Sequence, residues 1–150
     1  MSLEQTEHHL RDLGIDPGVE PVPADEVEQM TGARVPASLV RLLSLFAGGR
    51  IADPVYYFDP KYKRDVMIGW FLDRAELAET HESTSEVLAR TLVPIANDGG
   101  DNLLLVETGA EAGAVYFYEH GKELVDGKPP LYRVSPSLEQ FVLSLHREQQ

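Results

Sequence analysis

The turn between two apolar runs, residues 92–96 and 103–106, carries the densest set of polar groups that could bind a ligand. It reads Asn97-Asp98-Gly99-Gly100-Asp101-Asn102. A calcium loop offers oxygen ligands at alternate positions, with a glycine sixth and a glutamate twelfth. Here the two glycines separate Asp98 from Asp101, and the twelfth residue counted from Asp98 is Gly109. Because Asn, Asp and Gly are also what a tight hairpin requires, the pattern favours a turn over a cation site.

Other sequence patterns that carry enzyme chemistry are missing. The chain has no Gly-x-Ser-x-Gly elbow, no Gly-x-x-x-x-Gly-Lys phosphate loop and no His-Glu-x-x-His zinc helix. It also has no cysteine, which excludes thiolate metal sites and a cysteine nucleophile. We therefore expect no cofactor, no metal and no enzymatic activity. Catalytic groups can still assemble in space, so a small hydrolase-like enzyme remains an alternative.

The net charge of the chain indicates which classes of macromolecule it is suited to bind. There are 25 acidic and 13 basic residues, a formal net charge of −12. Such a field repels nucleic acid and anionic membranes, whereas it attracts a basic protein and speeds its association. Glu76, Glu79, Glu82 and Glu86 are spaced at threes and fours, which on one helix gives a negative ridge. Both observations also fit an acidic surface that serves solubility alone.

These groups must be positioned by elements that the apolar pattern predicts. Helical segments repeat apolar side chains at i, i+3, i+4 and i+7, and strands are short apolar or alternating runs. We expect helices over residues 2–13, 24–31, 35–47 and 136–145, and two short helical pieces over 74–88 that break near His81. We expect strands over residues 55–58, 66–72, 92–96, 103–106, 114–119 and 131–134.

The predicted elements indicate one α+β domain over residues 1–150, a twisted, mainly antiparallel sheet with N-terminal helices and a C-terminal helix packed on it. Closely linked strands from residue 92 onward predict an antiparallel meander. We expect strand 66–72 to be covered on both faces, Ser135 to cap the last helix, and the polar tail 146–150 to fray. The sequence shows no secretory signal and no apolar run near the roughly 20 residues that cross a bilayer, so we expect a soluble cytoplasmic protein.

Four segments in series resemble the SUKH superfamily, which includes a fungal cell-wall assembly regulator domain and many bacterial toxin-immunity proteins. They are the helix and glycine stop over 35–49, the hairpin over 92–105, the strand Ala114-Val115-Tyr116-Phe117-Tyr118-Glu119-His120, and the closing helix over 134–145. The resemblance covers most of the chain from residue 35 to 145. It implies an α+β fold without cofactor or known catalytic residues, and in bacterial members it implies neutralisation of a toxin by direct binding.

We therefore expect a non-catalytic protein-binding domain, an immunity protein whose partner is a basic toxin domain. A regulatory or scaffold domain unrelated to toxins is the alternative, and the oligomeric state stays open. Acidic side chains would steer the partner and exposed aromatic side chains would anchor it. The candidate partner-binding residues are Asp98, Asp101, Glu107, Glu76, Glu79, Tyr116 and Tyr118, with Tyr56 and Tyr57 as further aromatic candidates.

Overall fold

The computed structural model describes residues 3–16, 21–100, 102–119 and 127–148, apart from the side chains of Leu3 and Phe46. The helices are α1 (Leu3–Asp12), α2 (Ala24–Thr31), α3 (Ala37–Phe46), α4 (Arg74–Thr84) and α5 (Leu138–Ser144). The strands are β1 (Tyr56–Asp59), β2 (Arg64–Met67), β3 (Trp70–Phe71), β4 (Leu92–Asn97), β5 (Leu103–Glu107), β6 (Val115–Tyr118) and β7 (Leu131–Ser135). None of the helices within these ranges is both long and apolar enough to cross a membrane.

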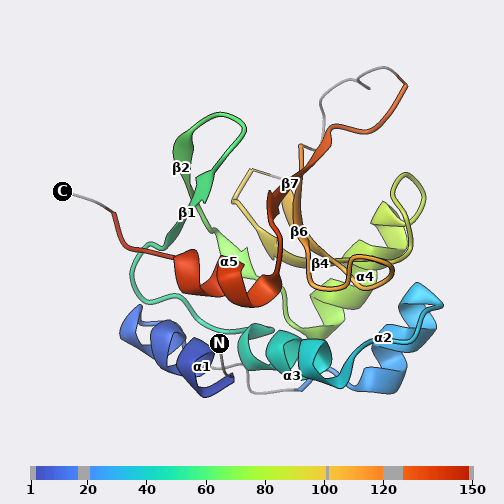
Figure 1. Ribbon diagram of the computed structural model, residues 1–150, viewed down its shortest axis with the longest axis horizontal. Helices are drawn as coiled ribbons and strands as arrows, with labels where there is room; N and C mark the ends of the chain where they lie inside the picture. Colours follow the sequence, from blue (N-terminus) through green and yellow to red (C-terminus); the bar gives the residue numbers. More distant parts are fainter. Residues whose placement is uncertain (1–2, 17–20, 101, 120–126, 149–150) are drawn as a thin grey trace.

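The strands form two antiparallel sheets. Five strands pair in the order β3-β4-β5-β6-β7, and β1 pairs with β2 in a separate hairpin. Helices α1, α2 and α3 line one side of the molecule, α5 lies between them and the strands, and α4 runs beside β4 (Figure 1). The predicted α+β class and the meander are confirmed, and β5 lies buried in the middle of the large sheet.

One face of the large sheet supplies most of the core. Leu104, Val106, Val115 and Phe117 alternate with residues of the opposite face and join one buried cluster with side chains of α3 and α5. The helical contribution follows the predicted stripe, with Leu138, Phe141, Val142 and Leu145 all buried. Burial of apolar surface at roughly 25 cal/mol per Å² is what holds helices and sheet together.

The prediction of a single covered strand over residues 66–72 is wrong. The run divides into β2, whose side chains are exposed or half-buried, and β3, which joins the large sheet. Gly69 explains the division, because its backbone passes so close to the 97–99 turn that an added Cβ would lie 2.7 Å from the Gly99 nitrogen. The Gly69 N–H donates to the Asn97 carbonyl at 2.8 Å, which fixes the crossing from one sheet to the other.

Helix α4 is continuous, so the predicted break near His81 is also wrong. An Asp73–Glu76 capping box opens the helix, and each side chain accepts a hydrogen bond from the other residue's backbone. His81 lies buried within the helix, and its Nε2 is 2.8 Å from the Arg90 carbonyl oxygen. That contact anchors the following loop, so residues 85–88 turn and do not start a new helix.

The C-terminal end differs from expectation at two points. Helix α5 is capped by Ser137, whose Oγ accepts from the Gln140 N–H at 3.1 Å, whereas Ser135 still belongs to β7. The predicted frayed tail is wrong at its start, because His146 and Tyr56 exchange backbone hydrogen bonds of 2.8 and 3.0 Å. Residues 149–150 lie outside the described ranges.

Candidate functional site

A row of side chains crosses all five strands of the large sheet on the face opposite the main core. Antiparallel pairing sets Trp70 opposite Asn97, Asn97 opposite Leu103, Leu103 opposite Tyr118 and Tyr118 opposite Leu131. Residues directly opposite each other in an antiparallel pair point to the same face. We call this the outer face. It ends at the edge strand β3 with Trp70, which is 44% exposed.

The next row on the outer face holds Leu105, Tyr116 and Arg133. Tyr116 is half-buried and its hydroxyl donates to the Glu111 carboxylate at 3.2 Å. Partial burial, followed by that hydrogen bond, raises the pKa of the Tyr116 hydroxyl. Tyr118 is only 8% exposed and belongs to the small apolar cluster beneath this face, so little of its ring is available to a partner.

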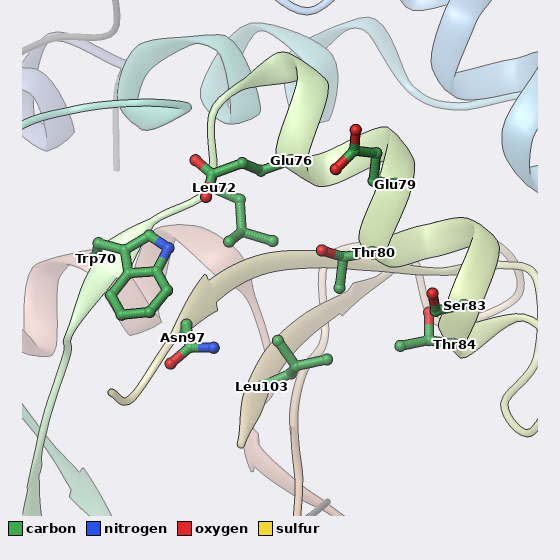
Figure 2. A pocket seen from close by; sticks show the side chains of 9 residues that line it. All are labelled: Trp70, Leu72, Glu76, Glu79, Thr80, Ser83, Thr84, Asn97 and Leu103. Carbon is green, nitrogen blue, oxygen red and sulfur yellow. The ribbon is translucent and has the colours of Figure 1, made fainter. Parts of the chain in front are cut away.

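A groove opens between Trp70 and helix α4. Its volume is about 530 Å³. Figure 2 shows Trp70 on one side, α4 above, and Asn97 and Leu103 on the sheet below. The groove combines an aromatic ring, apolar side chains, hydroxyl groups and two carboxylates, from Trp70, Leu72, Glu76, Glu79, Thr80, Ser83, Thr84, Asn97 and Leu103.

A second hollow of about 400 Å³ lies on the other side of Trp70. Its lining includes Gly48 and Gly49, which follow α3, together with Arg50, Asp73 and Glu76. Trp70 and Glu76 line both hollows. The exposed indole therefore stands between two depressions with an acidic residue at their junction.

The acidic rim of the groove comes from one side of α4. Glu76 and Glu79 are three residues apart, so their side chains are neighbours on the helix surface. One Glu76 oxygen accepts the Asp73 N–H of the capping box at 3.2 Å. Glu79 is exposed, and no Lys, Arg or His among the described residues pairs with either carboxylate. The rim therefore presents uncompensated negative charge.

The polar side chains of the turn that follows β4 form hydrogen bonds within the turn itself. The Asp98 carboxylate accepts hydrogen bonds from the Gly100 N–H at 2.7 Å, the Asn102 N–H at 3.2 Å and the Asn102 amide at 2.9 Å. The Asn97 side-chain oxygen accepts from the Gly99 N–H, and Gly99 has a φ of 88°. Turn formation thus accounts for the Asp and Gly residues here. Asp101 lies outside the described residues.

The remaining predicted residues do not gather at the groove. Glu107 sits at the far end of β5, where it accepts from the Gly109 N–H at 3.1 Å. Tyr57 is 1% exposed, between Phe117 and Phe141, so a partner cannot reach it. Tyr56 is half-buried in the separate hairpin. The structure brings Glu76 and Glu79 together with Trp70, and among the candidates that it describes it leaves the others outside the groove.

A family model matches residues 23–144, which is most of the chain. Its description is the SMI1/KNR4 family, SUKH-1. The chain belongs to the SMI1/KNR4 family. No curated protein and no solved structure matches it. Membership in the SMI1/KNR4 family agrees with a binding domain in general terms, and the outer face is where this member exposes its tryptophan.

The sequence predicted Glu76 and Glu79 but not their neighbours in this SMI1/KNR4 domain. Trp70 was not among the candidate partner-binding residues, because it lies in the run 66–72 that was expected to be covered on both faces. Its exposure follows from the sheet change at Gly69, which apolar periodicity does not reveal. Thr80 and Ser83 carried no signal, since polar residues on a helix are ordinarily solvated.

Proposed function

We propose that this SMI1/KNR4 domain is a non-catalytic binding protein that neutralises a cognate toxin by covering part of its surface. The observation that carries the proposal is the groove on the outer face, where an exposed tryptophan meets unpaired carboxylates. Tryptophan is among the residues that most often dominate binding energy, especially at the centre of a desolvated contact. The partner surface that fits this site is basic, with an apolar or planar group at its centre.

Long-range electrostatics supports the same partner. A net charge of −12 accelerates the approach of a basic protein and repels acidic ones. The groove is lined by hydroxyl and carboxylate groups but by no histidine, the side chain that most often acts as a general base. Binding without chemistry is therefore the function that the site supports best. Absence of cysteine fits a cytoplasmic location, in which we place the activity.

The test uses the product of the neighbouring gene as the probe. If that product is a toxin, co-expression with the wild-type protein should restore growth, and the two purified proteins should form a stable complex. Raising the salt concentration should lower the association rate steeply, because screening shortens the reach of the protein's field. Trp70→Ala should lose rescue, whereas Phe58→Ala, which removes an exposed aromatic ring from the hairpin, should keep it.

A harmless neighbouring product that neither binds nor needs neutralising would count against the toxin role. The alternative of a regulatory or scaffold domain would then take its place, with the same groove as the binding surface. If Trp70→Ala still restored growth, we would instead conclude that the partner binds outside the groove.

A further inference from the structure

We propose that the groove between Trp70 and α4 receives an arginine side chain of the partner. The inference rests on the proposed function, because it names what the partner inserts at that site. It concerns one occupant, a guanidinium on an extended aliphatic stem, and the lining of the groove supports each part of that side chain separately.

The aliphatic part of an arginine needs an apolar floor. Leu72 and Leu103 line the groove below α4, and both residues are largely buried (Figure 2). Arginine covers such surfaces with its methylene stem while its charged end stays polar or wet. A volume of about 530 Å³ accommodates one such side chain together with part of its backbone.

The planar end of an arginine needs an aromatic face and carboxylates. Trp70 offers an indole that is 44% exposed at one side of the groove. Guanidinium groups stack on tryptophan, and estimates for such contacts run from about 0.5 to 2 kcal/mol. Glu76 and Glu79 stand on the adjacent rim, where a guanidinium on the indole can donate hydrogen bonds to carboxylate oxygens.

The protein does not fill this position itself. Arg74, the arginine of α4, is turned to Glu26, with its guanidinium nitrogen 2.7 Å from that carboxylate. Among the described residues, neither Glu76 nor Glu79 has a basic partner. An anionic ligand would meet two like charges here, and a purely apolar one would desolvate them without compensation. A cation with a stacking plane matches both the indole of Trp70 and the two carboxylates of the rim.

Arginine fits better than lysine for a geometric reason. The guanidinium is flat and carries five donors in a fixed fork, so it can stack and bind carboxylates at once. The lysine ammonium is a compact, strongly hydrated charge that gives up more hydration on stacking. We therefore expect discrimination between the two at this groove.

The single tryptophan makes the site directly observable. Trp70 is the only tryptophan in the chain, so selectively excited tryptophan fluorescence reports on the groove and on the adjoining hollow that Trp70 also lines. The probe is a capped Gly-Arg-Gly peptide, titrated into the full-length protein. We expect a saturable change in Trp70 emission, a weaker response to Gly-Lys-Gly, and none to the neutral isostere Gly-citrulline-Gly. Added salt should weaken the arginine response.

Matched variants distinguish the effect of the two groove carboxylates, Glu76 and Glu79, from the effect of the protein's overall negative charge. Glu79→Gln and Glu76→Gln should each lower the affinity for Gly-Arg-Gly about two- to five-fold, as for a partly exposed ion pair. Glutamine at position 76 keeps the capping box, so helix α4 should remain intact. Glu82→Gln is the control, because Glu82 lies exposed on the same helix and does not line the groove.

The proposal is overturned if citrulline and arginine peptides give equal responses, or if Glu76→Gln and Glu79→Gln affect binding no more than Glu82→Gln. If the neighbouring gene product binds normally while the arginine peptide does not, the arginine site fails and the proposed function stands. If the arginine peptide binds with the expected selectivity and that product does not, the groove is an arginine site and the toxin role fails.

Discussion

The hydroxyl of Tyr132 in β7 donates a 2.9 Å hydrogen bond to the carboxylate of Asp59 in β1, which is completely buried. This contact joins the hairpin to the large sheet. The other Asp59 oxygen accepts the Lys61 backbone N–H at 2.9 Å, and Arg64 lies 3.9 Å away. A buried carboxylate is costly unless hydrogen bonds and positive charge compensate for its lost hydration, so the contact is central to how the two sheets hold together.

Removing the Tyr132 hydroxyl should destabilise the protein. Tyr132→Phe leaves one oxygen of a buried charge without its donor, and such losses cost about 1–3 kcal/mol of unfolding free energy. Chemical denaturation followed by circular dichroism measures the change. Tyr116→Phe is the matched control, since Tyr116 donates to the carboxylate of Glu111 at 3.2 Å and that carboxylate is exposed. Equal losses in the two variants would mean that the burial of Asp59 is unimportant.

Alkaline titration should uncover two tyrosines that resist ionisation. Burial raises the pKa of Tyr57, and burial together with the hydrogen bond to Asp59 raises that of Tyr132. In the unfolded chain both ionise near pH 10. Because the folded-state pKa is the higher one, their contribution to stability is complete below about pH 10 and is lost as pH rises above it.

The measurement is tyrosinate absorbance against pH, beside unfolding free energy over the same range. Part of the tyrosine absorbance should appear only with unfolding. The stability of Tyr132→Phe should fall less steeply above pH 10 than that of the wild type. If the unfolding free energy of both proteins fell equally steeply with pH, Tyr132 would not contribute to the loss of stability above about pH 10.

Trp70→Ala should separate binding from stability. The indole is 44% exposed, so its loss should change unfolding free energy by less than about 1 kcal/mol, as expected for a surface position. A central aromatic anchor typically contributes about 2 kcal/mol or more to binding, which corresponds to roughly a thirty-fold weaker Kd for the protein partner. Calorimetric titration and denaturation on the same preparations compare the two effects, with Phe58→Ala as the exposed-aromatic control.

Gly69→Ala should be strongly destabilising. The new methyl would lie 2.7 Å from the Gly99 nitrogen and 2.9 Å from the Asn97 oxygen, both backbone atoms that cannot move aside alone. Overpacking of this kind costs about 1–3 kcal/mol. Gly100→Ala is the control in the same turn, because its methyl would meet only an Asp98 side-chain oxygen at 3.5 Å. Thermal denaturation that ranked the two variants equally would contradict this account of the sheet crossing.

Sequence periodicity predicted the parts of the fold that depend on neighbouring residues. The strand predicted over 114–119 is present as β6, with Val115 and Phe117 in one apolar cluster and Tyr116 and Tyr118 at the other. The glycine stop within 35–49 follows from a local requirement for positive φ, which Gly48 meets with a φ of 72°. The SMI1/KNR4 resemblance was confirmed for the same reason, since its motifs follow local element patterns in order.

Features that depend on distant contacts were not predictable. The run 66–72 is apolar throughout, and only the approach of Gly69 to residues 97–99 shows where it leaves one sheet for the other. The buried Asp59 and Glu119 looked like ordinary acidic residues, because their partners Tyr132 and Tyr62 are far away in sequence. The groove was predictable only in part. The spacing of the glutamates in the sequence indicated the acidic side of a helix, but nothing in the sequence indicated that Trp70 would be exposed beside it.

The capping role of Glu76 limits which residues can replace it. One of its oxygens closes the start of α4, and the side chain also stands between the two hollows beside Trp70. Glutamine at position 76 would still cap the start of α4 but would remove the negative charge. Alanine would remove both the cap and the charge. Among proteins that share this groove, position 76 should therefore vary less freely than position 82, and a glutamine there would mark a domain that folds alike but selects a different partner.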